Sequence, residues 1–257
     1  MPCLNSPLIL YVLRASIRDK LVLSLIVLLV TAVSLSVFIG SSAITEPDAA
    51  ILTFIASSSR FIGVLALVLF VVFYVRRAYE THDIEYLLSR PISRISFVIS
   101  HLLAFSVLSL FFAVIVSAGL VLFASTFMNY EGFLVWSVSL ALELMIVSYA
   151  AFFFSMVLPS AVASTMATLA AYTLARMSGQ VLGIIDAGGQ SSLFEVLGKV
   201  MEAASVIVPR FDLFSQSSWL LYGPDTNIGL GFILIHGILF LFLITCSAIF
   251  DLLRKEF

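Results

Sequence analysis

The sequence predicts an all-α fold, a bundle of helices that crosses a lipid bilayer several times. Of the 257 residues, 61% are hydrophobic and only 11% are charged, whereas a typical soluble domain has about 25% charged residues. So few polar groups are not enough to cover the surface of a water-soluble protein of this size. Long apolar runs without two-residue alternation favour membrane helices over a β-barrel.

Six apolar runs account for the predicted spans. Crossing a hydrocarbon core of about 30 Å takes about 20 apolar residues. We therefore expect one transmembrane domain (residues 1–257) with six spans, at residues 21–40, 51–75, 97–123, 133–158, 161–185 and 228–250. The end of the fifth span stays open because Arg176 falls inside it. The first run exceeds the roughly 7–15 residues of a signal-peptide core, so we expect a retained anchor.

Lysine and arginine cluster in three segments that an even number of spans brings to one side of the membrane. The positive-inside rule makes that side the cytosol, so both termini are expected to be cytosolic, in the cell (inner or plasma) membrane. Residues 186–227 are then extracytoplasmic, with short helices that are either re-entrant or interfacial. The sequence leaves that choice open. A net charge of -2 argues against a nucleic-acid partner.

The loop at residues 76–96 is the long polar stretch on the cytosolic side. It has no Gly or Pro between Ala78 and Ser89, and Pro91 stops any helix there. Thr81 is placed to cap a short helix with acidic residues in its first turn. The pattern predicts an amphipathic coupling helix along the membrane surface. A charged loop that only satisfies the positive-inside rule is the alternative.

The same loop resembles the first cytosolic loop of ABC-2-type exporter permeases, which combines glutamates, a Leu-Leu-Ser/Thr-x-Pro element and a Ser-Arg pair. The matching residues are Glu80, Glu85, Leu87, Leu88, Ser89, Pro91, Ser93 and Arg94. The segment that begins Pro209-Arg-Phe-Asp is similar to a second element of that family. The chain departs from the family at residues 82–84, where His-Asp-Ile replaces a frequent Gly-Thr.

The resemblance implies a transmembrane permease subunit of an ATP-driven ABC exporter, which is not itself an enzyme. A separate cytosolic ABC ATPase dimer would bind ATP and Mg, and no phosphate loop of the form G-x-x-x-x-G-K-[ST] occurs in this sequence. A second permease copy, identical or different, would complete the transporter. The lead at residues 11–20 would help to bind the ATPase. The implied ATPase-coupling residues are Glu80, Thr81, Asp83, Ile84, Glu85, Leu87, Leu88, Ser89 and Arg90.

Arg60 and Glu143 form a candidate intramembrane polar pair. Each lies inside an apolar span, at a depth of about 14–15 Å from 1.5 Å per residue, so an ion pair between them is geometrically possible. Such a pair would either fix helix packing or contact a transported substrate. The histidines lack metal-ligand spacing, so we expect no metal. Because the resemblance places ATP in a separate subunit, we also expect no cofactor in this chain and no catalytic residue.

Other classes of function are weighed beside the exporter. A haem-exporter-like permease of cytochrome c maturation has a similar layout in a shorter chain. A non-transporting membrane scaffold also needs no catalytic residues. A membrane enzyme would need Asp, His or Ser side chains clustered at one depth, and this sequence offers a poor set. The transported substrate does not follow from the sequence.

Overall fold

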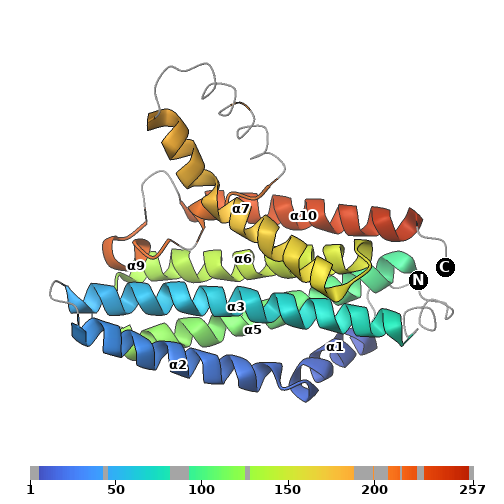
Figure 1. The fold of residues 1–257 in the computed structure, drawn as a ribbon, viewed down its shortest axis with the longest axis horizontal. Helices are drawn as coiled ribbons and strands as arrows, with labels where there is room; N and C mark the ends of the chain where they lie inside the picture. The colour runs from blue at the N-terminus through green and yellow to red at the C-terminus, as the bar shows by residue number, and fades with distance from the viewer. Residues whose placement is uncertain are drawn as a thin grey trace.

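The computed structural model describes residues 6–42, 46–81, 93–124, 128–187, 199, 208–214, 216–224 and 229–254, and regular structure in these ranges is helical throughout. The predicted all-α class is confirmed for this part of the chain. Figure 1 shows the elements in order, which are α1 (Ser6–Arg18), α2 (Leu21–Ser42), α3 (Pro47–Glu80), α5 (Arg94–Ala124), α6 (Tyr130–Val157), α7 (Ala161–Ala187), the 3-10 turn η1 (Phe211–Leu213), α9 (Trp219–Tyr222) and α10 (Leu230–Arg254).

Four of the described helices are long and apolar enough to cross a membrane, within α3, α5, α6 and α10. These helices fit a multi-pass membrane protein. Helices α2 and α7 occupy the first and fifth predicted spans but are not among the four, so the count of six spans stays a prediction. Helix α7 is the more polar because of its Ser and Thr residues. Several of their hydroxyls donate to carbonyls one turn earlier in the helix.

Helix α6 lies at the centre of the bundle, packed against α3, α5, α7, α9 and α10 (Figure 1). Of its apolar window 67% is buried, against 22% for α10 at the edge. Large side chains such as Trp136 and Phe152 fill the surrounding core. Helix α10 comes close to α6 at Gly237, where an added Cβ would meet the Leu142 side chain at 2.9 Å. Side chains on α6 therefore face almost every other helix.

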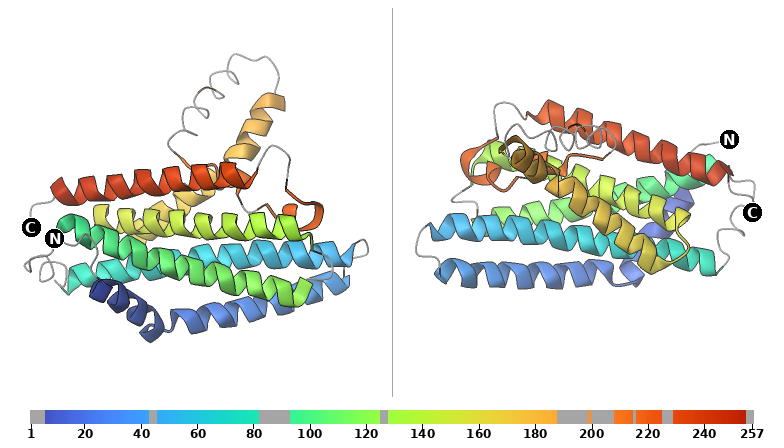
Figure 2. Two further views of the ribbon diagram at one scale, coloured as in Figure 1. Left: turned by 180° about the vertical axis from the view of Figure 1, so that it is seen from behind. Right: turned by 45° about the horizontal axis from the view of Figure 1, so that its top comes forward.

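Helix α7 leans away from this bundle. Its first half packs on α6 after the turn at Pro159, and its last turns project away from the other helices (Figures 1 and 2). The apolar side chains on its outer face, Val162, Met166 and Leu174, are exposed. The predicted fifth span is thus one helix that continues through Arg176 to Ala187.

Helix α1 is not among the helices predicted from the sequence, which gave residues 11–20 only as a lead before the first span. Leu8, Val12 and Ala15 recur at helical spacing and are buried, and α1 packs against α5. The chain then turns at Lys20, whose φ of 56° lies in the left-handed region, where a helix commonly ends. Helix α2 starts directly after this turn and packs along α3.

The segment before α10 folds back onto the bundle. The Asn129 amide donates to the Leu220 carbonyl at 2.8 Å, and α9 crosses so close to Gly132 that a Cβ there would overlap the Trp219 carbonyl. Trp219 is only 2% exposed, whereas Tyr222 is 78% exposed. Of the stretch predicted to be extracytoplasmic, residues 188–198, 200–207, 215 and 225–227 lie outside the described residues.

The two ends of the bundle differ in what they bring together. Helix α1 and the C-terminal ends of α3 and α10 lie at one end, whereas α9 and the start of α3 lie at the other (Figures 1 and 2). The first end carries the arginines at the end of α3 and the start of α5.

Candidate functional site

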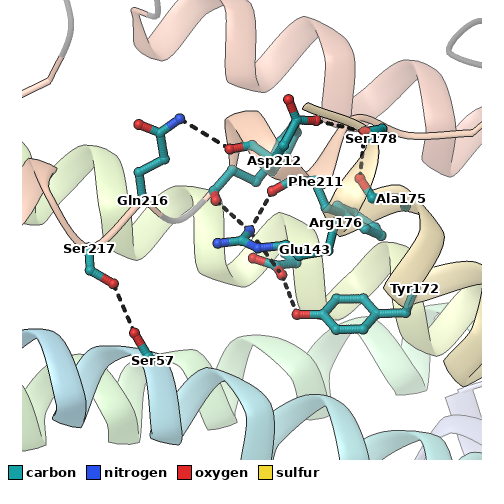
Figure 3. Close-up of polar contacts among 11 residues, drawn as sticks. Ser57, Glu143, Tyr172, Ala175, Arg176, Ser178, Phe211, Asp212, Gln216 and Ser217 are labelled. Carbon is teal, nitrogen blue, oxygen red and sulfur yellow. Dashed lines mark hydrogen bonds and ion pairs between the residues drawn. The ribbon is translucent and has the colours of Figure 1, made fainter. Parts of the chain in front are cut away.

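A charged side chain lies in the middle of the most buried helix. Glu143, halfway along α6, has no exposed surface. Its Oε1 accepts a hydrogen bond from the Tyr172 hydroxyl at 2.9 Å and lies 3.6 Å from Nη1 of Arg176 (Figure 3). Burying a lone carboxylate among apolar helices costs several kcal/mol. The hydrogen bond from Tyr172 and the positive charge of Arg176 therefore offset the cost of burying Glu143.

Both partners of Glu143 come from one face of α7. Tyr172 and Arg176 are four residues apart, which places them one helical turn from each other on the same side. From the sequence, Arg176 was seen only as an interruption of the fifth span. The four-residue spacing of Tyr172 and Arg176 within an apolar stretch could have indicated that both side chains face a polar partner.

The Arg176 guanidinium also holds the segment that precedes α10. Its Nη1 donates to the carbonyl of Phe214 at 2.7 Å and to the carbonyl of Phe211 (Figure 3). Phe211 is the first residue of η1 and Phe214 directly follows its last, and the Phe211 carbonyl also accepts from the Phe214 amide at 3.1 Å. One guanidinium thus joins α6, α7 and η1.

Asp212, in the middle of η1, extends the cluster. Its carboxylate accepts from the Ser178 hydroxyl at 3.0 Å and forms an ion pair with Arg210 at 2.8 Å. A Cβ added at Gly179 would collide with this carboxylate, so the glycine permits the close approach. The segment that begins at Pro209 therefore packs on α7.

Arg60 reaches the same region from α3. It interacts electrostatically with Tyr172 and with Arg176. One turn before it, the Ser57 hydroxyl lies 3.1 Å from that of Ser217 and links α3 to the returning segment (Figure 3). The predicted pair between Arg60 and Glu143 stays a prediction. The sequence did not predict the two described partners of Glu143, which are Tyr172 and Arg176.

The cluster leaves one polar atom without a hydrogen bond. Oε2 of Glu143 is buried and has no hydrogen-bond partner among the described residues. Burying a carboxylate oxygen without a hydrogen bond costs free energy. A bound polar group that donated a hydrogen bond to this atom would remove that cost. No group of three His, Cys, Asp or Glu side chains that could hold a metal occurs in the described part of the chain.

Most of the predicted ATPase-coupling residues lie outside the described residues. Glu80 is the last residue of α3, and the Thr81 hydroxyl donates to the Arg77 carbonyl at 2.9 Å, which closes that helix. The remaining seven, Asp83, Ile84, Glu85, Leu87, Leu88, Ser89 and Arg90, fall within 82–92, so the coupling helix itself stays a prediction.

The helices that flank that segment are anchored to the C-terminal ends of other helices. Before it, Arg76 donates to the Leu158 carbonyl at 3.2 Å and to the Pro159 carbonyl, at the turn from α6 to α7. After it, Arg94 donates to the Leu252 carbonyl at 3.1 Å, in the last turn of α10. Cations at helix C-termini satisfy free carbonyls and oppose the helix dipole.

The fold and the site define an all-helical chain with several helices able to span a membrane and a charge cluster buried among them. No family model, no curated protein and no solved structure matches the chain.

Proposed function

We propose that this protein is the transmembrane permease subunit of an ATP-driven ABC exporter. Two permease copies would work with a cytosolic ABC ATPase dimer, which would bind ATP and Mg. In this proposal the chain crosses the cell membrane six times with both termini in the cytosol.

The observation that carries the proposal is the anchoring of the two helices that flank the segment between α3 and α5. Arg76, near the end of α3, binds the turn between α6 and α7, and Arg94, the first residue of α5, binds the last turn of α10. A segment that receives force from an ATPase needs firm contacts with the helices that move. The resemblance of residues 80–94 to exporter permeases identifies the same segment independently.

The distribution of charge supports a cytosolic position for this end of the bundle. Arg18, Arg76, Arg77, Arg94 and Arg254 belong to helix ends that meet there. Arg77 also pairs with Asp19 at 3.3 Å, which joins the end of α3 to the turn after α1. Positive residues near the ends of spans stay on the cytosolic side.

The buried cluster gives the proposed transport cycle an element with two arrangements. Closure of the ATPase dimer would push the coupling segment and displace the helices tied to Arg76 and Arg94. The bonds of Arg176 to Glu143 and to η1 lie between helices that such a movement would shift. Ionisable groups inside a membrane mark transport paths by default.

Co-purification of an ATPase tests the proposal. We expect tagged protein from its native cells to bring down a Walker-type ATPase, and Glu80→Lys or Leu87→Asp to abolish this at unchanged expression. Glu131→Lys is the matched control, because Glu131 is also an exposed glutamate but lies at the opposite end of the bundle. An ATPase retained by both coupling variants would refute the assigned contact. A protein that purifies alone would favour the scaffold.

A further inference from the structure

A cavity of about 280 Å³ lies between α6, α7 and α10. Ala150 contributes to its wall from α6, Ala171 from α7 and Ile244 from α10, while Pro209 and Phe211 line it from the returning segment. Its volume is close to the lower limit of ordinary small-ligand pockets. It adjoins the charge cluster through Tyr172, which lines the cavity and donates to Glu143.

The packing of the helices explains why the space exists. Both α7 and α10 pack on α6, but they do not form a packed pair with each other among the described elements. The lean of α7 opens the gap, and alanines at 150 and 171 leave it unfilled. Ser247 on α10 is exposed and Ile244 is half-buried, so the cavity can be reached from the surface of the bundle.

The hydroxyls that line the cavity have no hydrogen left to donate to an occupant. Thr168 donates to the Ser164 carbonyl at 2.7 Å, Ser247 to the Leu243 carbonyl at 2.9 Å, and Tyr172 to Glu143. The other described side chains of the lining carry no polar atoms. A carboxylate or phosphate therefore finds no side-chain donor, and water finds too few partners to be held well.

The depth of the cavity selects among apolar occupants. Ile146 and Val147 line it one turn beyond Glu143, near the middle of α6, and Thr168 and Ala171 lie in the first half of α7, about two to three turns from its start. In a helix that crosses the bilayer, this depth corresponds to the hydrocarbon core. Lipid chains are the apolar groups present there at high concentration.

We propose that this cavity binds one acyl chain of a membrane phospholipid, lodged between α7 and α10 against α6. The acyl chain would pack against the ring of Tyr172, whose hydroxyl donates to Glu143. Tyr172 would therefore link the bound lipid to the charge cluster. The inference does not depend on an ATPase partner, because it concerns binding alone.

Photolabelling tests the inference in reconstituted protein. Vesicles of phosphatidylcholine would carry a diazirine near the end of one acyl chain, and labelled peptides would be mapped by mass spectrometry. We expect label on cavity residues in wild type and about tenfold less in Ala171→Trp, the factor that a loss of roughly 1.4 kcal/mol of binding free energy produces. Ala170→Trp is the matched control, since Ala170 is exposed on α7 and outside the cavity.

Two further measurements keep the test decisive. Ala150→Leu fills the cavity from α6 with a smaller change, so it replaces Ala171→Trp if that variant fails to fold. A phosphatidylcholine with the diazirine in its headgroup should leave the cavity unlabelled. Label that survives both filling substitutions, or headgroup label inside the cavity, would overturn the assignment.

Discussion

Glu143 and Arg176 show how one charged residue in an apolar helix can determine which helices associate. The carboxylate has no exposed surface, and the Arg176 guanidinium on the next helix lies 3.6 Å away. Removing one member of such a pair leaves the other charge buried without a counter-charge, which is far more costly than an ordinary surface substitution.

A double-mutant cycle tests this pairing. We expect Glu143→Ala alone to lower the free energy of unfolding by about 3 kcal/mol, and Glu143→Ala with Arg176→Ala to show a coupling energy of about 1–3 kcal/mol. Denaturant titration in detergent provides the measurement. Arg18→Ala, at a side chain that is 71% exposed, should be additive with Glu143→Ala.

A second cycle with Arg60→Ala separates the two arginines. The sequence predicts a pair of Glu143 with Arg60. If Glu143→Ala and Arg60→Ala lower the free energy of unfolding additively, that prediction is refuted. Additive losses with Arg176→Ala would contradict the ion pair described for α6 and α7.

At the level of the elements, two arginines act as caps for helices far away in the sequence. Arg94, the first residue of α5, donates to carbonyls in the last turn of α10. These carbonyls have no partner further along their own helix. The contact therefore stabilises the end of α10 and fixes its position beside α5.

Hydrogen exchange measures the strength of this cap. We expect Arg94→Gln to accelerate amide exchange in residues 248–254 about fivefold, because loss of a charged hydrogen bond costs about 1 kcal/mol or more. The matched control is Arg18→Gln at the same end of the bundle. Equal exchange of the α10 peptide in both variants would show that the Arg94 contact does not hold the helix end.

The apolar runs of the sequence predicted the positions of the six long helices to within a few residues. They could do so because a membrane helix satisfies its own backbone, so its extent depends on local composition. Contacts between helices do not have this property. The pairing of Glu143 with Arg176, the packing of Trp219 and the rest of α9 on α6, and the cap of Arg94 on α10 each join residues far apart in the chain.

Helix α1 was missed for a different reason. Its amphipathic pattern is short and carries exposed apolar residues such as Leu10 and Ile17. Beside the strong hydrophobicity of α2, residues 6–18 did not stand out as a helix. The buried face of α1 depends on α5, an element that follows much later in the sequence.

For the whole molecule, sidedness is the prediction that joins the ends of the bundle to the membrane. In a background of Cys3→Ser and Cys246→Ser, we expect Glu131→Cys to react with a membrane-impermeant maleimide in intact cells. Arg18→Cys should react only after the cells are opened, because basic ends stay cytosolic. Both positions are exposed, at opposite ends of the bundle. The reverse labelling pattern, or labelling of both in intact cells, would contradict the proposed orientation.

The contact of Arg76 with the turn between α6 and α7 has a mechanical consequence. This turn joins the two arms of a helical hairpin, α6 with Glu143 and α7 with Arg176. At 1.5 Å per residue, the arm from Leu158 back to Glu143 is roughly 22 Å long. A swing of about 10° between the arms would move their charged groups apart by roughly 4 Å over this length. A small displacement at the membrane surface would thereby be magnified into the opening of an ion pair at mid-depth.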